Sequence, residues 1–204
     1  MFKKKLAFTL SEIMIAMTVI GVIATLIFPG LVRGQKTTQA RAQFDTAYAS
    51  LAKSIVEMES AGHAVMPDGY PTAQSFYDVF INFNKVTSKD AANTTFTTNN
   101  GIKYTISKQS IEIDNGEGEP VTIEPLLIEV DINGENKHPN SSGWDIFKFQ
   151  LTNDGIQPYG GKSTDKEVPQ NAEAAEHCIT ADPDVCAYYA VAEDEYFKTL
   201  YNAR

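Results

Sequence analysis

Compact catalytic motifs are missing from this sequence. It contains no G-x-S-x-G nucleophile motif, no H-E-x-x-H zinc-protease motif and no glycine-rich loop of the kind that holds a phosphate. Histidine is also rare: His63, His138 and His177 lie in three separate turn-like segments with no shared motif. We therefore predict that the protein is not an enzyme and that it has no catalytic residues.

Positive charge is scarce as well. The chain has 17 Lys and Arg residues against 26 Asp and Glu residues, and its formal net charge at pH 7 is −9. Nucleic-acid phosphates are bound by clustered Lys and Arg side chains, and an acidic protein repels them. No basic patch is visible in the body of the chain, so we expect no nucleic-acid partner. The acidic residues are spread over predicted strands and turns, where a solvated face explains them.

What the chain does have is one long apolar run near its amino terminus. From Ile13 to Val32 there are 20 residues without a charge. At about 1.5 Å per residue, a helix of this length spans roughly 30 Å, the thickness of a bilayer core. Three lysines at positions 3–5 precede the run. By the positive-inside rule the short amino-terminal end stays in the cytoplasm and the rest of the chain is exported.

Glu12 lies at the edge of this apolar run. An ionisable side chain inside a membrane segment costs about 3 kcal/mol on insertion scales, so it is by default a functional residue. A removed signal peptide also begins basic and continues apolar, but a carboxylate is out of place in its core, and no small-x-small cleavage site follows Phe28. Cutting the chain before Phe8 would place a positive amine four residues from Glu12. We therefore favour a membrane anchor over a removed signal.

The segment from Ala7 to Glu12 reads A-F-T-L-S-E and resembles the prepilin cleavage and methylation motif of type IV pilins and type II secretion pseudopilins. The basic leader, Phe8, Glu12 and the apolar run occur in the order typical of that family. The resemblance implies that a membrane aspartic peptidase removes residues 1–7 by cutting between Ala7 and Phe8, and that the amine of Phe8 is then methylated. Ala7 stands where the family usually has Gly, so we expect slower processing.

The resemblance also implies a role for Glu12 in assembly. Residues 8–32 would form a helix that spans the membrane first and lies in a filament core later. Opposite charges attract strongly at low dielectric, and an unpaired buried charge is penalised. Pairing of Glu12 with the Phe8 amine of the next subunit would therefore set the axial register of the stacked helices. The alternative is that Glu12 merely reaches the lipid headgroups.

A structural subunit of a type IV pilus or of a type II secretion pseudopilus is the function that the resemblance implies. The expected partners are homologous pilin subunits, the prepilin peptidase and methyltransferase, a membrane assembly platform and membrane lipid. We expect a single pass through the bacterial cytoplasmic membrane with the head outside the cytoplasm, and then a filament in the periplasm or at the cell surface. The alternative is a membrane-anchored exported enzyme or ligand-binding module that keeps its helix as a tether.

Beyond Val32 the composition becomes polar, but the helical periodicity continues. An apolar stripe recurs at spacings of three and four residues, as in an amphipathic helix, at Phe44, Tyr48, Leu51, Ile55 and Met58. Gly62 is a suitable stop signal. The pattern predicts one helix from Thr9 to Ala61, in which residues 33–61 are the amphipathic half.

Residues 62–204 are predicted to form one globular periplasmic or extracellular head domain. Gln74 to Phe83 favours a short helix, and Asn93 to Asn100 a loop or an edge strand. Alternating apolar residues predict strands at 102–106, 111–113, 121–123, 126–132 and 144–149, separated by turns at Asn115-Gly116, Asn133-Gly134 and Asp154-Gly155. The expected fold class is α+β, with a long N-terminal helix packed on an antiparallel β-sheet head, as in type IV pilins.

Oxygen-bearing side chains gather after the predicted strand 126–132. A D-x-N-G segment followed by P-N-x-x-G-x-D resembles a turn-and-strand signature of prepilin-like proteins, and some pseudopilins hold calcium in a comparable loop. Calcium takes six to eight oxygen ligands, and the candidate ligands are Asp131, Asn133, Asn140 and Asp145. The alternative is a structural clamp in which Asp145 and Asn140 bond backbone amides, because Asn and Asp are turn formers. Apart from this candidate calcium ion, we expect no cofactor.

Cysteine occurs only at Cys178 and Cys186. In an exported domain, two cysteines at this distance suggest a disulfide, and closing so short a loop contributes about 2–3 kcal/mol in the chain-entropy model. A zinc site is the alternative, but two cysteines and the adjacent His177 are too few for a closed tetrahedral site. We therefore predict a disulfide.

Overall fold

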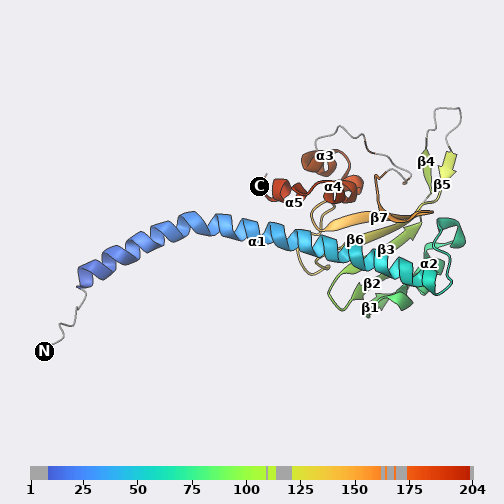
Figure 1. Ribbon diagram of the computed structural model, residues 1–204, viewed down its shortest axis with the longest axis horizontal. Helices are drawn as coiled ribbons and strands as arrows, with labels where there is room; N and C mark the ends of the chain where they lie inside the picture. Colours follow the sequence, from blue (N-terminus) through green and yellow to red (C-terminus); the bar gives the residue numbers. More distant parts are fainter. Residues whose placement is uncertain are drawn as a thin grey trace.

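The computed structural model describes residues 9–108, 110–113, 121–161, 164, 168 and 174–202. One helix, α1 (Leu10–Ser60), extends far beyond the remainder of the chain, which forms a rounded head at its carboxyl end (Figure 1). Thr9 is the N-cap and Ala61 the C-cap of α1. The predicted single helix from Thr9 to Ala61 is therefore confirmed. We use "head" below for the residues that follow α1.

The second half of α1 packs on the head through the predicted stripe. Its buried apolar side chains are Ala40, Phe44, Ala47, Leu51, Ile55 and Met58. Phe44 meets Phe147 edge to face, with ring centroids 4.7 Å apart, and the half-buried Tyr48 stacks on Phe149 at 5.3 Å. Each fully buried large apolar side chain contributes about 1.5–3 kcal/mol, so this stripe is what holds α1 on the head.

A six-stranded antiparallel sheet with the order β1-β2-β3-β6-β7-β8 forms the centre of the head. The strands are β1 (Val86–Asp90), β2 (Thr95–Thr98), β3 (Lys103–Lys108), β6 (Leu126–Asp131), β7 (Ile146–Thr152) and β8 (Gly155–Pro158). In the central pair, Ile128 lies opposite Phe149 and Val130 opposite Phe147. Because side chains alternate between the faces of a strand, these apolar residues share the face that α1 covers. The α+β prediction is confirmed.

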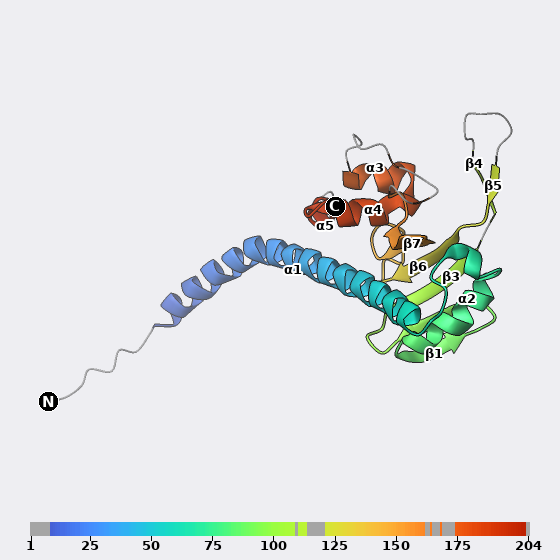
Figure 2. The ribbon, with the colours of Figure 1, turned by 45° about the vertical axis from the view of Figure 1, so that its right-hand side comes forward.

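Smaller elements surround this sheet. The predicted strands at 111–113 and 121–123 are found as β4 (Ile111–Ile113) and β5 (Val121–Ile123), a two-stranded sheet that projects from the head (Figure 2). The predicted Asn115-Gly116 turn lies outside the described residues. The predicted helix at 74–83 is found as α2 (Ala73–Phe80) followed by a 3₁₀ turn, Ile81–Phe83. Two further 3₁₀ turns are Pro67–Gly69 and Pro183–Val185.

Three short helices that sequence reasoning did not predict complete the head. They are α3 (Ala174–Ala181), α4 (Cys186–Ala192) and α5 (Tyr196–Asn202). The last of them packs on α1, where the rings of Phe197 and Phe44 lie 5.7 Å apart. Figures 1 and 2 both place α5 at the end of the head from which the N-terminal half of α1 emerges.

The sheet differs from the prediction in four places. The edge strand β8 (Gly155–Pro158), which follows the predicted Asp154-Gly155 turn, was not predicted. Asn93 to Asn100 contains β2, which is an inner strand because β1 pairs with its other side. The edge strand β1 was missed because Val86 is its only apolar residue and therefore no alternation marks it. Asn133-Gly134 is only one turn in a longer connection from β6 to β7, so the strand predicted at 144–149 begins at Ile146.

Candidate functional site

The N-terminal half of α1 makes no packing contact that buries it. Within the described residues, α1 is the one helix long and apolar enough to cross a membrane, and none of its most apolar stretch is buried. Its exposed large apolar side chains include Leu10, Ile13, Met14, Ile15, Met17, Val19, Ile20, Leu26, Phe28 and Leu31. A continuous apolar surface of this size requires lipid or other apolar helices around it.

Glu12 is held at the start of this helix by a capping box with Thr9. Oε2 of Glu12 accepts hydrogen bonds from the Thr9 amide at 2.9 Å and the Thr9 hydroxyl at 2.8 Å. The Glu12 amide in turn donates to Oγ1 of Thr9 at 3.3 Å. The side chains of Thr9 and Glu12 thus bond backbone amides that have no partner within the first helical turn. A carboxylate at the N-terminus of a helix also interacts favourably with the helix dipole. Glu12 is therefore fixed close to the residue that precedes Thr9.

That preceding residue is Phe8, the predicted new amino terminus. Ala7 and Phe8 lie outside the described residues, so the predicted cleavage site and leader are known from the sequence alone. Phe8 is directly adjacent to the N-cap residue of α1. A cut before Phe8 would therefore put the new amino terminus one residue before the N-cap of α1 in the sequence.

The four candidate calcium ligands come together in the connection between β6 and β7. Asp145 is buried, and its Oδ1 accepts from the Ser141 amide at 2.7 Å while its Oδ2 accepts from the Asn140 amide at 2.8 Å and from Nδ2 of Asn133 at 3.0 Å. Oδ1 of Asp131 accepts from the amides of Asn133 at 3.2 Å and Gly134 at 2.8 Å. This arrangement is a clamp that orders the loop.

Asn140 takes part in the clamp through its backbone, whereas its side-chain amide donates to the carbonyl of Glu135 at 2.7 Å. Burial, together with the nearby charge of Asp145, raises the pKa of Asp131. Oδ1 of Asn133 is buried without a hydrogen-bond partner, and such an acceptor suits a cation. Against this, both carboxylate oxygens of Asp145 already accept hydrogen bonds, from three N–H donors in all, and no group of three His, Cys, Asp or Glu residues suited to a metal is found among the described residues. Calcium binding stays a prediction.

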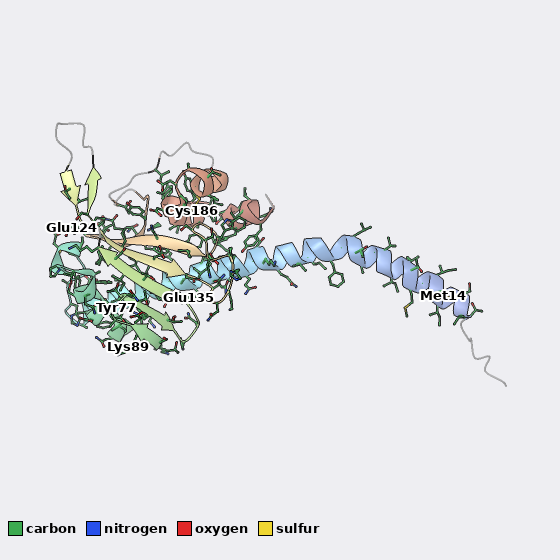
Figure 3. All side chains as sticks on the ribbon, turned by 180° about the vertical axis from the view of Figure 1, so that it is seen from behind. Met14, Tyr77, Lys89, Glu124, Glu135 and Cys186 are labelled. Atoms are coloured by element: carbon green, nitrogen blue, oxygen red, sulfur yellow. A yellow bond between two sulfur atoms is a disulfide. The ribbon has the colours of Figure 1, made fainter. Side chains whose placement is uncertain are left out.

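Cys178 and Cys186 form the predicted disulfide, with their Cα atoms 5.2 Å apart. The bond joins α3 to the start of α4, where Figure 3 labels Cys186, and both cysteines are fully buried. The hydroxyl of Tyr196 lies 3.4 Å from Sγ of Cys178 and donates to the carbonyl of Gly143 at 2.7 Å. The disulfide region is thereby attached to the loop that Asp145 orders.

Sequence reasoning missed Arg41, which connects α1 to the end of α4 in the head. Its Nη1 donates to the carbonyls of Ala190 at 3.1 Å and Glu193 at 3.3 Å, which lie at the end of α4. Its Nε pairs with Asp45, one turn further along α1, at 3.1 Å. A cation is favourable at the carboxyl end of a helix. The available signal was an arginine immediately beside the apolar stripe, but its partners follow about 150 residues later.

Comparison with curated proteins and with solved structures gave no match. Residues 2–28 match the family model described as the prokaryotic N-terminal methylation motif. The matched range includes the basic leader, Phe8, Glu12 and most of the apolar run. The chain therefore carries the prepilin-type signature of type IV pilins and pseudopilins, on a long N-terminal helix that packs on an antiparallel sheet.

Proposed function

We propose that this protein is a pilin-like structural subunit, cut between Ala7 and Phe8, methylated on Phe8 and assembled into a type IV pilus or a type II secretion pseudopilus. The observation that supports this most is the exposed apolar half of α1, which begins at a capped carboxylate and lies largely within the matched N-terminal methylation motif. In the membrane this surface would be covered by lipid, and in a filament by the same surface of neighbouring subunits.

Glu12 would act as the register element of that assembly. Removal of the leader creates an amine next to the capping box, and methylation keeps this amine charged while adding apolar surface. A buried carboxylate without a cation is strongly penalised, so subunits would slide until Glu12 of one meets the amine of another. Head-to-tail contacts of this kind produce open helical assemblies. An assembly platform in the membrane would supply the force.

The mass of the mature protein, recovered from cells with functional processing, tests the proposal. We expect loss of residues 1–7 and the addition of one methyl group. A chain that starts at Met1, or a cut beyond Val32, contradicts it and favours the tethered enzyme or a removed signal.

Two substitutions of Glu12 separate charge from helix capping. Glu12→Gln keeps an oxygen that accepts from Thr9 but removes the charge, whereas Glu12→Val removes both. We expect both variants to be inserted and cut, and both to assemble poorly or lose methylation. Normal filaments from Glu12→Gln alone would show that Glu12 contributes only by capping the helix. Normal filaments from both variants would show that Glu12 has no role in assembly.

A further inference from the structure

A pocket of about 300 Å³ opens at the point where α1 leaves the head. One wall is α1 itself, from Lys36 to Gln43, and the other is formed by the β6–β7 connection and α5. The residues that matter for its chemistry are Lys36, Gln43, Lys137, His138, Trp144 and Tyr201. Figure 3 shows this region through Glu135, which is labelled on the same connection near the emerging helix. Its volume is at the lower end of the range for small-ligand sites, about 300–1,000 Å³.

The pocket is cationic although the chain is acidic. Lys36, Lys137 and His138 are exposed at its walls, and no carboxylate side chain of the described residues lines it. Within the same part of the chain, neither Lys36 nor Lys137 has an ion-pair partner. Lys53, Lys103, Lys148 and Lys198 pair with carboxylates, whereas Lys85 and Lys89 are also without an ion pair among the described residues but do not line this pocket. In a protein of formal charge −9, the two lysines of the pocket are available for an external anion.

The distance of the pocket from the apolar run, measured along the axis of α1, indicates which kind of anion it could bind. Lys36 follows Val32 by four residues, which is roughly 6 Å along a helix axis. The headgroup layer adds about 5–7 Å to each side of the hydrocarbon core. When residues 13–32 fill the core, Lys36 is therefore level with the lipid phosphates, and the head residues that share the pocket lie directly above them.

The aromatic side chains of the pocket fit the same location. Trp144 and Tyr201 meet edge to face with ring centroids 5.4 Å apart, and both line the pocket. Trp and Tyr are enriched where membrane meets water, because their rings are apolar and their edges are polar. A site for an acidic side chain of another subunit would also need the lysines. It would not need the Trp144–Tyr201 pair, nor a position at the level of the lipid phosphates.

We propose that the pocket holds the phosphate of an anionic phospholipid in the outer leaflet, and so seats the head on the membrane before assembly. This rests on the proposed function, which places the head outside the membrane on a single helix. Lys36 and Lys137 attract the phosphate from opposite walls, while Trp144 and Tyr201 contact the glycerol region. Extraction into a filament then requires the head to release its lipid.

The full chain offers a direct probe, because Trp144 is its single tryptophan. The chain is reconstituted into phosphatidylcholine vesicles in which phosphatidylglycerol replaces phosphatidylcholine stepwise, with a constant fraction of lipid carrying a quencher on its headgroup. Trp144 quenching should rise with phosphatidylglycerol. Lys36→Ala and Lys137→Ala should each lower the apparent affinity for the anionic lipid about fivefold, since a basic residue near the surface contributes about that factor. Lys89→Ala, on exposed β1 far from the emerging helix, is the matched control (Figure 3).

Quenching that ignores phosphatidylglycerol, or an equal effect of all three substitutions, overturns the proposal. Quenching that depends on the protein-to-lipid ratio, and is the same in pure phosphatidylcholine, also overturns it and makes a second copy of the chain the occupant. Flotation of the vesicles separates this proposal from the one on which it rests. If the chain floats with the vesicles but Trp144 quenching shows no preference for phosphatidylglycerol, only the proposed lipid site is contradicted. If the chain does not float, both the lipid site and the membrane-anchored subunit are contradicted.

Discussion

The hydroxyl of Tyr196 donates a hydrogen bond of 2.7 Å to the backbone carbonyl of Gly143. Both residues are buried, and the two are 53 positions apart in the sequence. Burial raises the pKa of Tyr196, so the hydroxyl stays protonated and can always donate. Together with the ring contact between Trp144 and Tyr201, this hydrogen bond connects the C-terminal helices to the loop that Asp145 orders, and through it to the central strand β7.

Replacing Tyr196 with Phe tests the strength of this connection. The ring still fills its place, but the Gly143 carbonyl loses its donor in a buried site, which costs about 1–3 kcal/mol. Urea denaturation of the full chain in detergent should show this loss. Tyr188→Phe is the control, because Tyr188 is half-buried on the adjacent helix and the same atom is removed. Equal losses from the two variants would contradict a specific role for the Tyr196 hydroxyl.

Arg41→Met should loosen the carboxyl end of α4 from α1. The substitution keeps the apolar stem and removes the donors to Ala190 and Glu193. Because 30% of the Arg41 side chain is exposed, solvent screening reduces the effect and we expect a loss of about 1 kcal/mol. Hydrogen exchange should become faster in α4 and α5.

Lys53→Met provides the comparison for Arg41→Met. Lys53 also lies on α1 and pairs with Glu57 at 3.5 Å, but its side chain is 75% exposed. Exposed pairs of this kind contribute little, about 0.3–0.5 kcal/mol. If Lys53→Met destabilises the protein as much as Arg41→Met, the carbonyl contacts of Arg41 are not what stabilises α4.

Glu193 should make stability depend on pH. Its partial burial raises its pKa in the folded protein above the unfolded value, which is about 4.3. A carboxyl group of this kind binds its proton more tightly in the folded state, so its contribution to stability falls as the pH rises through the window above 4.3. Glu193→Gln should therefore be more stable than the wild type at neutral pH, and the difference should shrink as the pH approaches 4.

Thermal unfolding at a series of pH values measures the difference in stability between Glu193→Gln and the wild type. The backbone carbonyl of Glu193 remains available to Arg41 in the variant, so the contact at the end of α4 is kept. Glu195→Gln removes a carboxylate that is 67% exposed two residues later and serves as the control. A stability difference for Glu193→Gln that is constant between pH 4 and neutral would contradict the effect of burial.

The parts of this fold that were predictable are those with strong local patterns. The stripe from Phe44 to Met58 specifies α1 because an apolar residue recurs every three or four positions over the length of a long helix. Likewise, alternation at Ile102, Tyr104 and Ile106 marks β3; all three residues are buried, and Ile102 directly precedes the strand. The T-x-x-E spacing of Thr9 and Glu12 is a capping-box pattern, a local signal for the helix start that the sequence analysis did not use.

The missed parts depend on contacts between distant residues. The helices α3, α4 and α5 have only seven or eight residues each, and helices of that length are not stable without tertiary packing. In this protein the packing includes buried apolar side chains such as Phe197 and Leu200, together with the disulfide and the hydrogen bonds of Arg41 and Tyr196. In the candidate site, the sequence pointed to Asp131, Asn133, Asn140 and Asp145, and a clamp on backbone amides was the predicted alternative to calcium; Asp145 does accept from the amides of Asn140 and Ser141. The sequence did not indicate that Asn140 would enter the clamp through its backbone while its side chain donates to the carbonyl of Glu135.

Gly143 and Gly155 form a matched pair for separating backbone strain from packing. Both have a positive φ, of 81° and 97°, where a side chain costs about 1–2 kcal/mol. A Cβ on Gly155 meets nothing within 4 Å, whereas one on Gly143 would lie 2.6 Å from Sγ of Cys186. Cys186 is buried and held by its disulfide, so it cannot move aside.

Gly155→Ala should therefore lower the free energy of unfolding only by the cost of the strained backbone, whereas Gly143→Ala should lower it by about 1–3 kcal/mol more through overpacking. Urea denaturation of both full-length variants in detergent measures this gap in unfolding free energy between them. Reduction of the disulfide frees Sγ of Cys186, so the gap should narrow in reducing buffer although both variants become less stable. Equal losses in oxidising buffer would mean that the loop shifts away from Cys186 at no cost, and the disulfide would then have no part in fixing its position.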